Sequence, residues 1–359
     1  KLKAAFPDMF RRKQQLQNLA IIILEAYFKN VDENWKLEIK IIIDKFIAEI
    51  KGGEIQFVLL LHLNGIGVGP EPIQIRENIQ LRLPQKQDFG NPQTVVGNVM
   101  PQLIPSAILE IKFSGDFRNV PPVELDKYCS VLKLFGVGPI DYLSYELFST
   151  SCILLFLPRA YGQVAIKTGL QSLILYKNME DKLKMFYNDL EIKINKLISP
   201  NSANSYLRIA FDRYSEALLE RTIFERKIAN VIMAFEALFS NKALEIAYSL
   251  SLLVGKFFSY FVAYPTKIRE QIKTAYDIRS KFAHGEVYKG KKLDTLRDKY
   301  GSEQAFLQQL LEYLRIAIVI FLYCESNKED LVKKLDASIL DEEIAAGLKS
   351  EIQGALAYI

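Results

Sequence analysis

Side chains that bind metals or form cross-links are scarce in this sequence of 359 residues. It has two histidines and three cysteines, Cys129, Cys152 and Cys324, which lie far apart without any Cys-x-x-Cys pair. This composition argues against a zinc site of the finger type. We therefore expect no metal, no cofactor, cysteines that are mostly buried in the core, and a reducing, cytoplasmic location.

Long apolar runs are also lacking. "LAIIILEAYF" contains Glu25, "SCILLFLP" is short, and "LRIAIVIFLYC" is about half of the roughly 20 apolar residues that cross a membrane. We expect no membrane segment and no signal peptide. A net charge of +4 is too small to imply nucleic acid by itself, and 50% apolar with 25% charged residues is typical of a globular protein.

Proline and glycine are rare in the second part of the chain. Twelve of 13 prolines and 12 of 18 glycines lie at or before Pro200. Because these residues mark turns and break helices, the pattern predicts an α+β protein with a boundary near "LISPNSANS". Residues 1–200 are expected to form a mixed α/β domain of unknown role, and residues 201–359 an all-α helical bundle.

Periodicity predicts the elements of the first domain. Helices are expected near 8–29 and 32–50, with Asp32 as N-cap, near 121–135, with Pro121 and Pro122 in the first turn, and near 179–198. The runs expected as strands are "EIQFVLLLHL", "IQIRENIQLRL", "SAILEIKFSG", "YELFST", "CILLFLP" and "SLILYK".

The second domain shows helical spacing of apolar residues almost throughout. A long helical pattern runs from Leu207 to Leu238, and further helices are expected near 242–262, 266–285, 302–325 and 341–356. Four long helices with modest connections predict a bundle.

Two glycine-rich stretches might suggest phosphate loops. Neither "NGIGVGP" nor "FGVGP" is followed by Gly-Lys-Ser/Thr, and each ends in a proline, so we interpret both as turns. His62 lies in the apolar strand "FVLLLHLNG" and is interpreted as a core histidine rather than a ligand.

The second histidine, His284, lies five residues after Arg279 and directly before Gly285. Histidine titrates close to neutral pH and arginine is always charged, so the pair suits proton transfer beside a phosphate. It equally suits a helix terminus, where cations oppose the partial negative charge and glycine adopts a left-handed conformation. Spacing alone leaves both interpretations open.

The stretch "AYDIRSKFAHGE", with "IANVIMAFEALF" upstream, resembles the Apea-like branch of the HEPN superfamily. That branch has a helical bundle with an Arg-Ser-Lys-x-x-His-Gly motif, which matches Arg279 to Gly285. The resemblance covers about 205–325. "IQIRENIQLRLP" is also similar, less specifically, to the domain that often precedes this bundle.

HEPN proteins are often metal-independent endoribonucleases, so the resemblance implies that Arg279 and His284 are the reactive residues of a hydrolase. A toxin or an antiviral defence protein is the expected setting. RNA supplies its own nucleophile, the 2′-OH, and cleavage needs a base, an acid and positive charge on the phosphate. Histidine can do either proton transfer, and arginine binds two phosphate oxygens at once.

Helix geometry predicts a homodimer through the bundle. Five residues turn through about 500°, which leaves Arg279 and His284 roughly 140° apart. Either the last turn loosens at Gly285, or a two-fold partner completes the site and supplies a second histidine. The expected supporting residues are Ser280, which shares the face of His284, Asp277, Tyr276 and Glu236, which could meet Arg279 across helices or be merely structural.

The loop expected after the motif is basic. Lys281, Tyr288, Lys289, Lys291 and Lys292 could bind RNA, the lysines through phosphates and the tyrosine by stacking on a base. The alternative is a solvated charged loop.

Other functions stay open at this point. One is a non-catalytic HEPN dimer that binds RNA or a protein partner. Another is presentation of a substrate to a separately encoded nucleotidyltransferase, although the tyrosine-containing motif typical of that role is not clear next to the pair. The N-terminal domain could also bind a protein partner.

Overall fold

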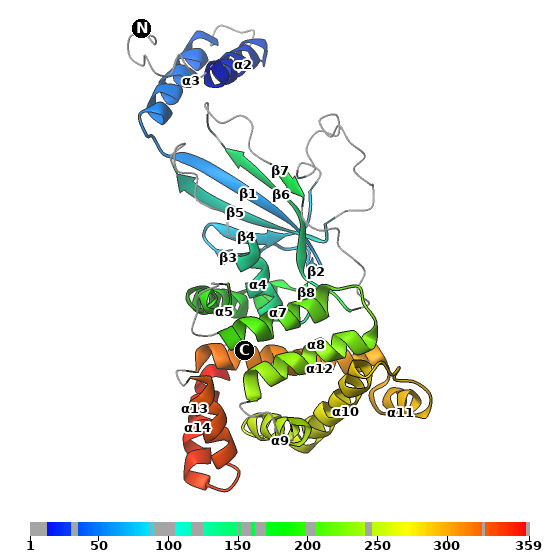
Figure 1. Cartoon of the computed structure of the whole chain (residues 1–359). Coiled ribbons are helices and arrows are strands. Elements are labelled where there is room, and N and C mark those ends of the chain that lie inside the picture. The colour runs from blue at the N-terminus through cyan, green and yellow to red at the C-terminus, as the bar shows by residue number, and fades with distance from the viewer. Residues whose placement is uncertain are drawn as a thin grey trace. The chain divides into compact units, whose positions relative to one another are not determined.

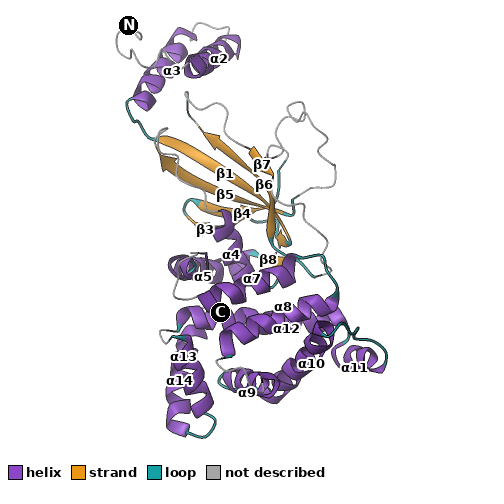
Figure 2. Ribbon diagram, in the orientation of Figure 1, coloured by secondary structure: helices purple, strands orange, loops and turns teal. Residues whose placement is uncertain are grey.

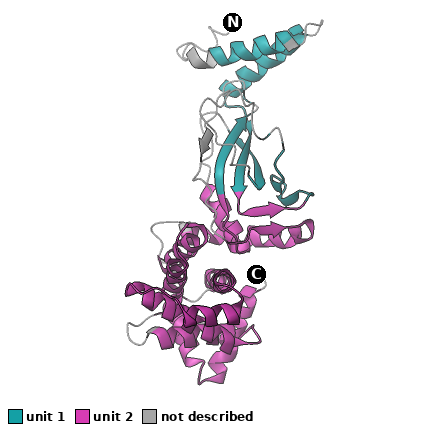
Figure 3. Ribbon diagram, turned by 90° about the vertical axis from the view of Figure 1, so that its right-hand side faces the viewer, with its two compact units in different colours: residues 1–63, 70–124, 142–164 teal, residues 64–69, 125–141, 165–359 magenta. Residues whose placement is uncertain are grey.

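The computed structural model describes residues 13–29, 35–85, 88, 105–115, 125–149, 151, 159–161, 170–198, 205–240, 246–324 and 327–356 (Figure 1). A mixed region with an antiparallel sheet precedes an all-helical region, so the expected α+β class is confirmed (Figure 2). Contacts divide the chain into two compact units (Figure 3). One comprises residues 1–63, 70–124 and 142–164, and the other comprises residues 64–69, 125–141 and 165–359.

A six-stranded sheet forms in the first unit, with the described strands in the order β3-β4-β5-β1-β6-β7. Strands β1 and β5 are antiparallel, from Ile55 opposite Gly115 to Leu63 opposite Ala107. On β1, His62 is a core residue as predicted, with Nδ1 2.8 Å from Ser144 Oγ. The bounds are β1 Ile55–Asn64, β3 Ile73–Arg76, β4 Ile79–Arg82, β5 Ala107–Gly115, β6 Asp141–Ser149 and β7 Arg159–Tyr161.

The stretch "IQIRENIQLRL", expected to be one strand, forms the two strands β3 and β4, which pair antiparallel. Glu77 and Asn78 make the turn between them, and Asn78 Nδ2 donates to the Lys112 carbonyl oxygen at 2.8 Å. Alternation of apolar and polar residues has the same period in one strand or two, so it could not reveal this break. Asn favours turns and was the available signal.

Two helices, α2 (Lys13–Lys29) and α3 (Trp35–Ile50), pack around Leu19, Phe46 and Ile50. They agree with the helices expected near 8–29 and 32–50. The N-cap role of Asp32, the strand "CILLFLP" with Cys152, and the prolines expected at the start of the next helix lie outside the described residues.

The second unit contains the remaining helices and a short parallel pair of strands. Helices α5 and α6 correspond to the one expected near 179–198, whereas α11 and α13 were not expected. The bounds are β2 Ile66–Val68, α4 Leu125–Phe135, β8 Leu173–Leu175, α5 Glu180–Lys193, α6 Asn195–Ile198, α7 Ser205–Leu219, α8 Phe224–Phe239, α9 Ile246–Phe258, α10 Pro265–Ala283, α11 Lys291–Tyr300, α12 Glu303–Tyr323, α13 Lys328–Ala337 and α14 Glu342–Leu356.

The long helical pattern from Leu207 to Leu238 is two helices, α7 and α8, and not one. Ile223 has extended backbone with φ −66° and ψ 156°, and the chain reverses so that the two helices pack on each other. No proline or glycine marks this break. The reversal lets the apolar stripe of each helix cover the other, which a single long helix could not do.

Helix α8 lies at the centre of the bundle and contacts α7, α9, α10 and α12. Its Phe239 meets Phe257 of α9 and Phe321 of α12, with ring centroids 5.2 and 5.1 Å apart. The apolar side chains that α8 buries are Ile228, Ala229, Val231, Ile232, Ala234, Phe235, Leu238 and Phe239.

Helix α12 is long and apolar enough to cross a membrane by length and composition alone, although the run "LRIAIVIFLYC" is not. Of its most apolar window, 67% is buried inside the protein, as in the core helix of a bundle. Its Arg315 is buried and donates to the Leu134 carbonyl oxygen of α4 at 2.7 Å. Cys324, which follows α12, and Cys129 on α4 are buried, as expected.

The two glycine-rich stretches pack against each other and against Leu173. Gly65 has φ +72°, and its carbonyl oxygen accepts the Leu173 N–H at 3.1 Å. A Cβ at Gly65 would overlap the backbone carbonyl of Pro139, and a Cβ at Gly138 would lie 2.9 Å from Leu173 N. These glycines allow the backbones to pack closely, and this packing explains why both stretches are rich in glycine without a role in binding phosphate.

We predict that Gly65→Ala lowers the free energy of unfolding by about 2–4 kcal/mol, because it combines left-handed backbone strain with a clash against backbone. Gly347→Ala is the matched control. Gly347 lies in α14, where an added Cβ would meet no atom within 4 Å, so alanine there should stabilise the helix by about 0.5–1 kcal/mol. Thermal unfolding of both variants measures the difference, and equal melting temperatures would contradict it.

Candidate functional site

Helix α10 ends at the predicted glycine. The Glu286 N–H donates to the Lys281 carbonyl oxygen at 2.9 Å, and the Gly285 N–H donates to the Phe282 carbonyl oxygen at 3.1 Å. Gly285 has φ +76°. This pair of bonds around a left-handed glycine is the Schellman motif, which satisfies the last carbonyl groups of a helix. The motif fixes where the helix stops, after Ala283, and makes His284 its C-cap residue.

The imidazole of His284 is exposed to solvent. In the described part of the chain, no hydrogen bond or ion pair of its ring is found. An exposed imidazole at a helix C-terminus can exchange protons with a ligand.

Arg279 is held from two sides. Its guanidinium Nη2 lies 3.6 Å from Glu236 Oε2 of α8, and its Cζ lies 5.6 Å from the centre of the Tyr276 ring. The sequence left open whether Glu236 meets Arg279 across helices or is merely structural, and the structure places the two side chains in contact. With 31% of its side chain exposed, Arg279 keeps part of the guanidinium available to solvent.

Glu236 is the more buried partner, with 20% of its side chain exposed. Burial raises the pKa of its carboxyl group, and the positive charge of Arg279 offsets this only in part. Within the described residues its Oε1 atom has no hydrogen-bond partner. A carboxylate that is desolvated and incompletely paired binds a proton more readily than an ordinary glutamate.

The last turn of α10 does not loosen before His284. The His284 N–H is shared between the carbonyl oxygens of Ser280 and Lys281, each at 3.1 Å, so the regular bond to the fourth residue back is kept while the turn begins to tighten. Regular helix up to this point keeps Arg279 and His284 on different faces. Ser280 is half-buried, and no hydrogen bond from it to the His284 ring is found among the described residues.

Asp277 faces lysines rather than the Arg279 and His284 pair. Its Oδ2 lies 3.2 Å from Lys292 Nζ and 3.8 Å from Lys281 Nζ. Lys291 and Lys292 are the first residues of helix α11 and not of a loop, because Gly290 with φ +64° ends the loop. Lys289 and Lys291 are exposed.

Tyr288 is only 7% exposed. The Lys281 ammonium lies 5.3 Å from the centre of the tyrosine ring. The backbone N–H of Tyr288 donates to Glu225 Oε1 at 3.3 Å. This burial leaves little of the ring for a stacked RNA base, so the stacking role expected for Tyr288 does not fit the structure. The tyrosine instead forms part of a wall between α10 and α11.

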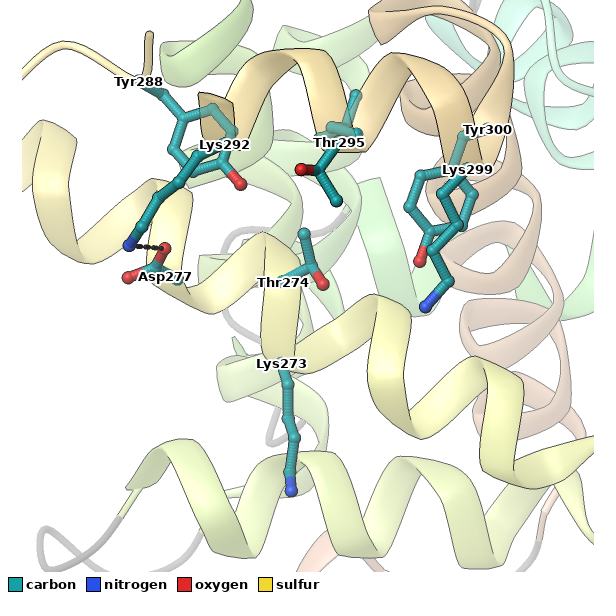
Figure 4. Close-up of a pocket in the computed structure, with 9 residues that line it drawn as sticks. Lys273, Thr274, Asp277, Tyr288, Lys292, Thr295, Lys299 and Tyr300 are labelled. Atoms are coloured by element: carbon teal, nitrogen blue, oxygen red, sulfur yellow. Dashed lines mark hydrogen bonds and ion pairs between the residues drawn. The ribbon is translucent and has the colours of Figure 1, made fainter. Parts of the chain in front are cut away.

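That wall belongs to a cleft of about 420 Å³ between α10 and α11 (Figure 4). Neither Arg279 nor His284 lines it. Sequence reasoning found three of the lining residues and missed the others, although the density of basic residues between 265 and 300 was an available signal. The lining residues are Lys273, Thr274, Asp277, Tyr288, Lys292, Thr295, Leu296, Lys299 and Tyr300.

Comparisons with known proteins give no support to any family assignment. No protein-family model, no curated protein and no solved structure matches this chain.

We predict that Glu236→Gln stabilises the protein at pH 7 and has a smaller effect at pH 4. A carboxyl group with a raised pKa in the folded state contributes stability at low pH that is lost as the pH rises through that pKa. Glutamine keeps the shape and removes the cost of burying a charge. Thermal unfolding at both pH values tests this, and an equal shift at pH 4 and pH 7 would refute it.

Proposed function

We propose that this protein is a metal-independent endoribonuclease of the HEPN type, in which Arg279 and His284 act on RNA. The observation that carries the proposal is the exposed imidazole of His284 on the same helix terminus as a partly exposed arginine. The resemblance of residues 279–285 to the superfamily motif adds to it. A role in a toxin or in antiviral defence fits such an activity.

The proposed reaction uses the RNA 2′-OH as nucleophile. A base removes its proton, the oxygen attacks the adjacent phosphorus, and the bond from phosphorus to the 5′-oxygen breaks. An acid protonates the departing 5′-oxygen, so the products carry a 2′,3′-cyclic phosphate and a 5′-OH. The His284 imidazole suits either proton transfer, and the Arg279 guanidinium stabilises charge on the phosphate oxygens.

Glu236 and Tyr276 would position Arg279 in this mechanism. The Glu236 carboxylate, at 3.6 Å, and the Tyr276 ring, at 5.6 Å, hold the guanidinium in place. Arg279 therefore loses less conformational freedom when it binds phosphate. We place no proton transfer on Glu236. Because its Oε1 is buried, that atom has no open path to a substrate.

A two-fold dimer would supply the second proton-transfer group. Each chain has one usable histidine, since His62 is buried in the sheet. The regular end of α10 separates Arg279 from His284 around the helix, so a groove between two copies is the simplest way to gather these groups.

A second candidate function is a non-catalytic HEPN dimer that binds RNA or a protein. One observation favours it. Arg279 is paired with Glu236 and is therefore partly neutralised before any phosphate arrives. In this function the pair would be a structural contact between α8 and α10.

We expect purified protein in excess EDTA to cleave single-stranded RNA into fragments with cyclic-phosphate ends. Arg279→Ala and His284→Ala should each lower the rate by about 100-fold or more, the scale of a lost proton-transfer or charge-stabilising group. The matched control is Arg226→Ala on α8, which removes an arginine with a similar 3.6 Å ion pair, to Glu220. Equal background cleavage in all four proteins would favour the binding function.

We expect His284→Ala chains to inactivate the wild-type chains with which they form mixed dimers, if both histidines of a dimer are required. In an equal mixture allowed to exchange subunits, about a quarter of the dimers would be fully wild type, so the rate per wild-type chain should fall to about half. Titration of the variant into a constant amount of wild-type protein measures this. A rate that stays constant would show that each chain works alone.

A further inference from the structure

Positive charge is concentrated in one segment of the chain. Residues 265–300 contain ten lysines and arginines and five aspartates and glutamates, a net charge of +5, while the whole chain has +4. The remainder of the chain therefore carries a net charge of −1. This segment forms α10, the connection after it, and α11, which are the elements that line the cleft.

The cleft has the size and the mixed lining of a small-molecule site. Its volume of about 420 Å³ lies within the range of roughly 300–1,000 Å³ that is usual for such sites. In Figure 4, Thr274 of α10 and Thr295 of α11 lie across from each other, with Lys292 at one end and Lys299 at the other. Leu296, Tyr288 and Tyr300 also line the cleft, but each is at most 8% exposed, so they close its floor rather than offer an open apolar face.

Acidic residues compensate the lysines of the cleft only in part. Asp277 is shared by two ammonium groups, those of Lys292 at 3.2 Å and Lys281 at 3.8 Å. The crowding lowers the pKa of Lys281, chiefly because of Lys292. An anion placed beside these groups would supply the negative charge that one carboxylate cannot.

The second cationic end is held by an ion pair at the surface. Lys299 pairs with Glu270 at 2.9 Å, but that carboxylate is 62% exposed. An exposed ion pair of this kind contributes little and is readily exchanged for another partner. The hydroxyl groups of Thr274 and Thr295 already donate to the carbonyl oxygens of Glu270 and Lys291, so the lysines carry the attraction for an anion.

We infer that the cleft between α10 and α11 binds a nucleotide through its phosphate, which would lie at Lys292 or Lys299. The nucleotide is either free or part of an RNA strand, since both present the same phosphate and base. The inference is separate from the cleavage chemistry, and only its RNA form builds on the proposed function.

Titration calorimetry with each ribonucleoside 5′-monophosphate, beside the matching nucleoside, tests the free form. Fluorescence anisotropy with a short 2′-O-methyl oligoribonucleotide tests the RNA form, because that strand lacks the nucleophile and cannot be cut. Saturable binding of the monophosphate identifies a free nucleotide, and binding of the oligonucleotide alone identifies RNA. Absence of both overturns the inference, as does equal binding of the nucleoside without phosphate.

The double variant Lys292→Gln with Lys299→Gln should weaken binding by about tenfold for each lysine that contacts the phosphate. Asp277→Asn should tighten it, because the variant removes a carboxylate that competes with the anion for the lysines. The matched control is Lys333→Gln with Lys349→Gln, which removes the same charge from exposed positions on α13 and α14. Circular dichroism confirms that each variant is folded.

Equal weakening in the control pair would overturn the inference, because it would show general charge attraction. Weaker binding by Asp277→Asn would also overturn it, because it would show a different role for the carboxylate. The result is independent of the nuclease assay. If the cleft variants lose binding but the wild-type protein cleaves no RNA, the proposed function is refuted and the cleft site is supported. If the wild-type protein cleaves RNA but the cleft variants bind as well as the wild type, the cleft site is refuted and the proposed function is supported.

Discussion

Burial of helix α8 is the interaction on which the rest of the helical unit depends. Its apolar side chains meet α7, α9, α10 and α12, and removing that much apolar surface from water is the main source of stability in a bundle. Because α8 is surrounded, the carboxylate that it directs toward α10, Glu236, lies in a poorly hydrated place. The need to compensate that charge accounts for the position of Arg279 at 3.6 Å.

The end of α10 places a guanidinium and an imidazole in different surroundings. Arg279 is tied to the bundle by Glu236, whereas His284 lies beyond the packed turns and is exposed to a ligand. The lysines around Asp277 form a third group, on the side that faces α11.

Elements with an unambiguous period were predictable from the sequence. Strands β1 and β5 and helices α10 and α12 follow from alternation or helical spacing, and Pro265 and Gly285 mark the two ends of α10. Helix α11 was missed because its residues are polar and its first turn carries Lys291 and Lys292, which oppose the helix dipole. The break between α7 and α8 was missed because no proline or glycine accompanies it.

The sequence by itself determined the mixed and helical regions, the end of α10 and the identity of Arg279 and His284 as candidates, because local backbone preferences and side-chain chemistry act over a few residues. Only the tertiary structure decided that Glu236 reaches Arg279, that Tyr288 is buried, and that Asp277 gathers lysines from two helices. Such contacts join residues that the chain order keeps apart, and packing of whole helices fixes them.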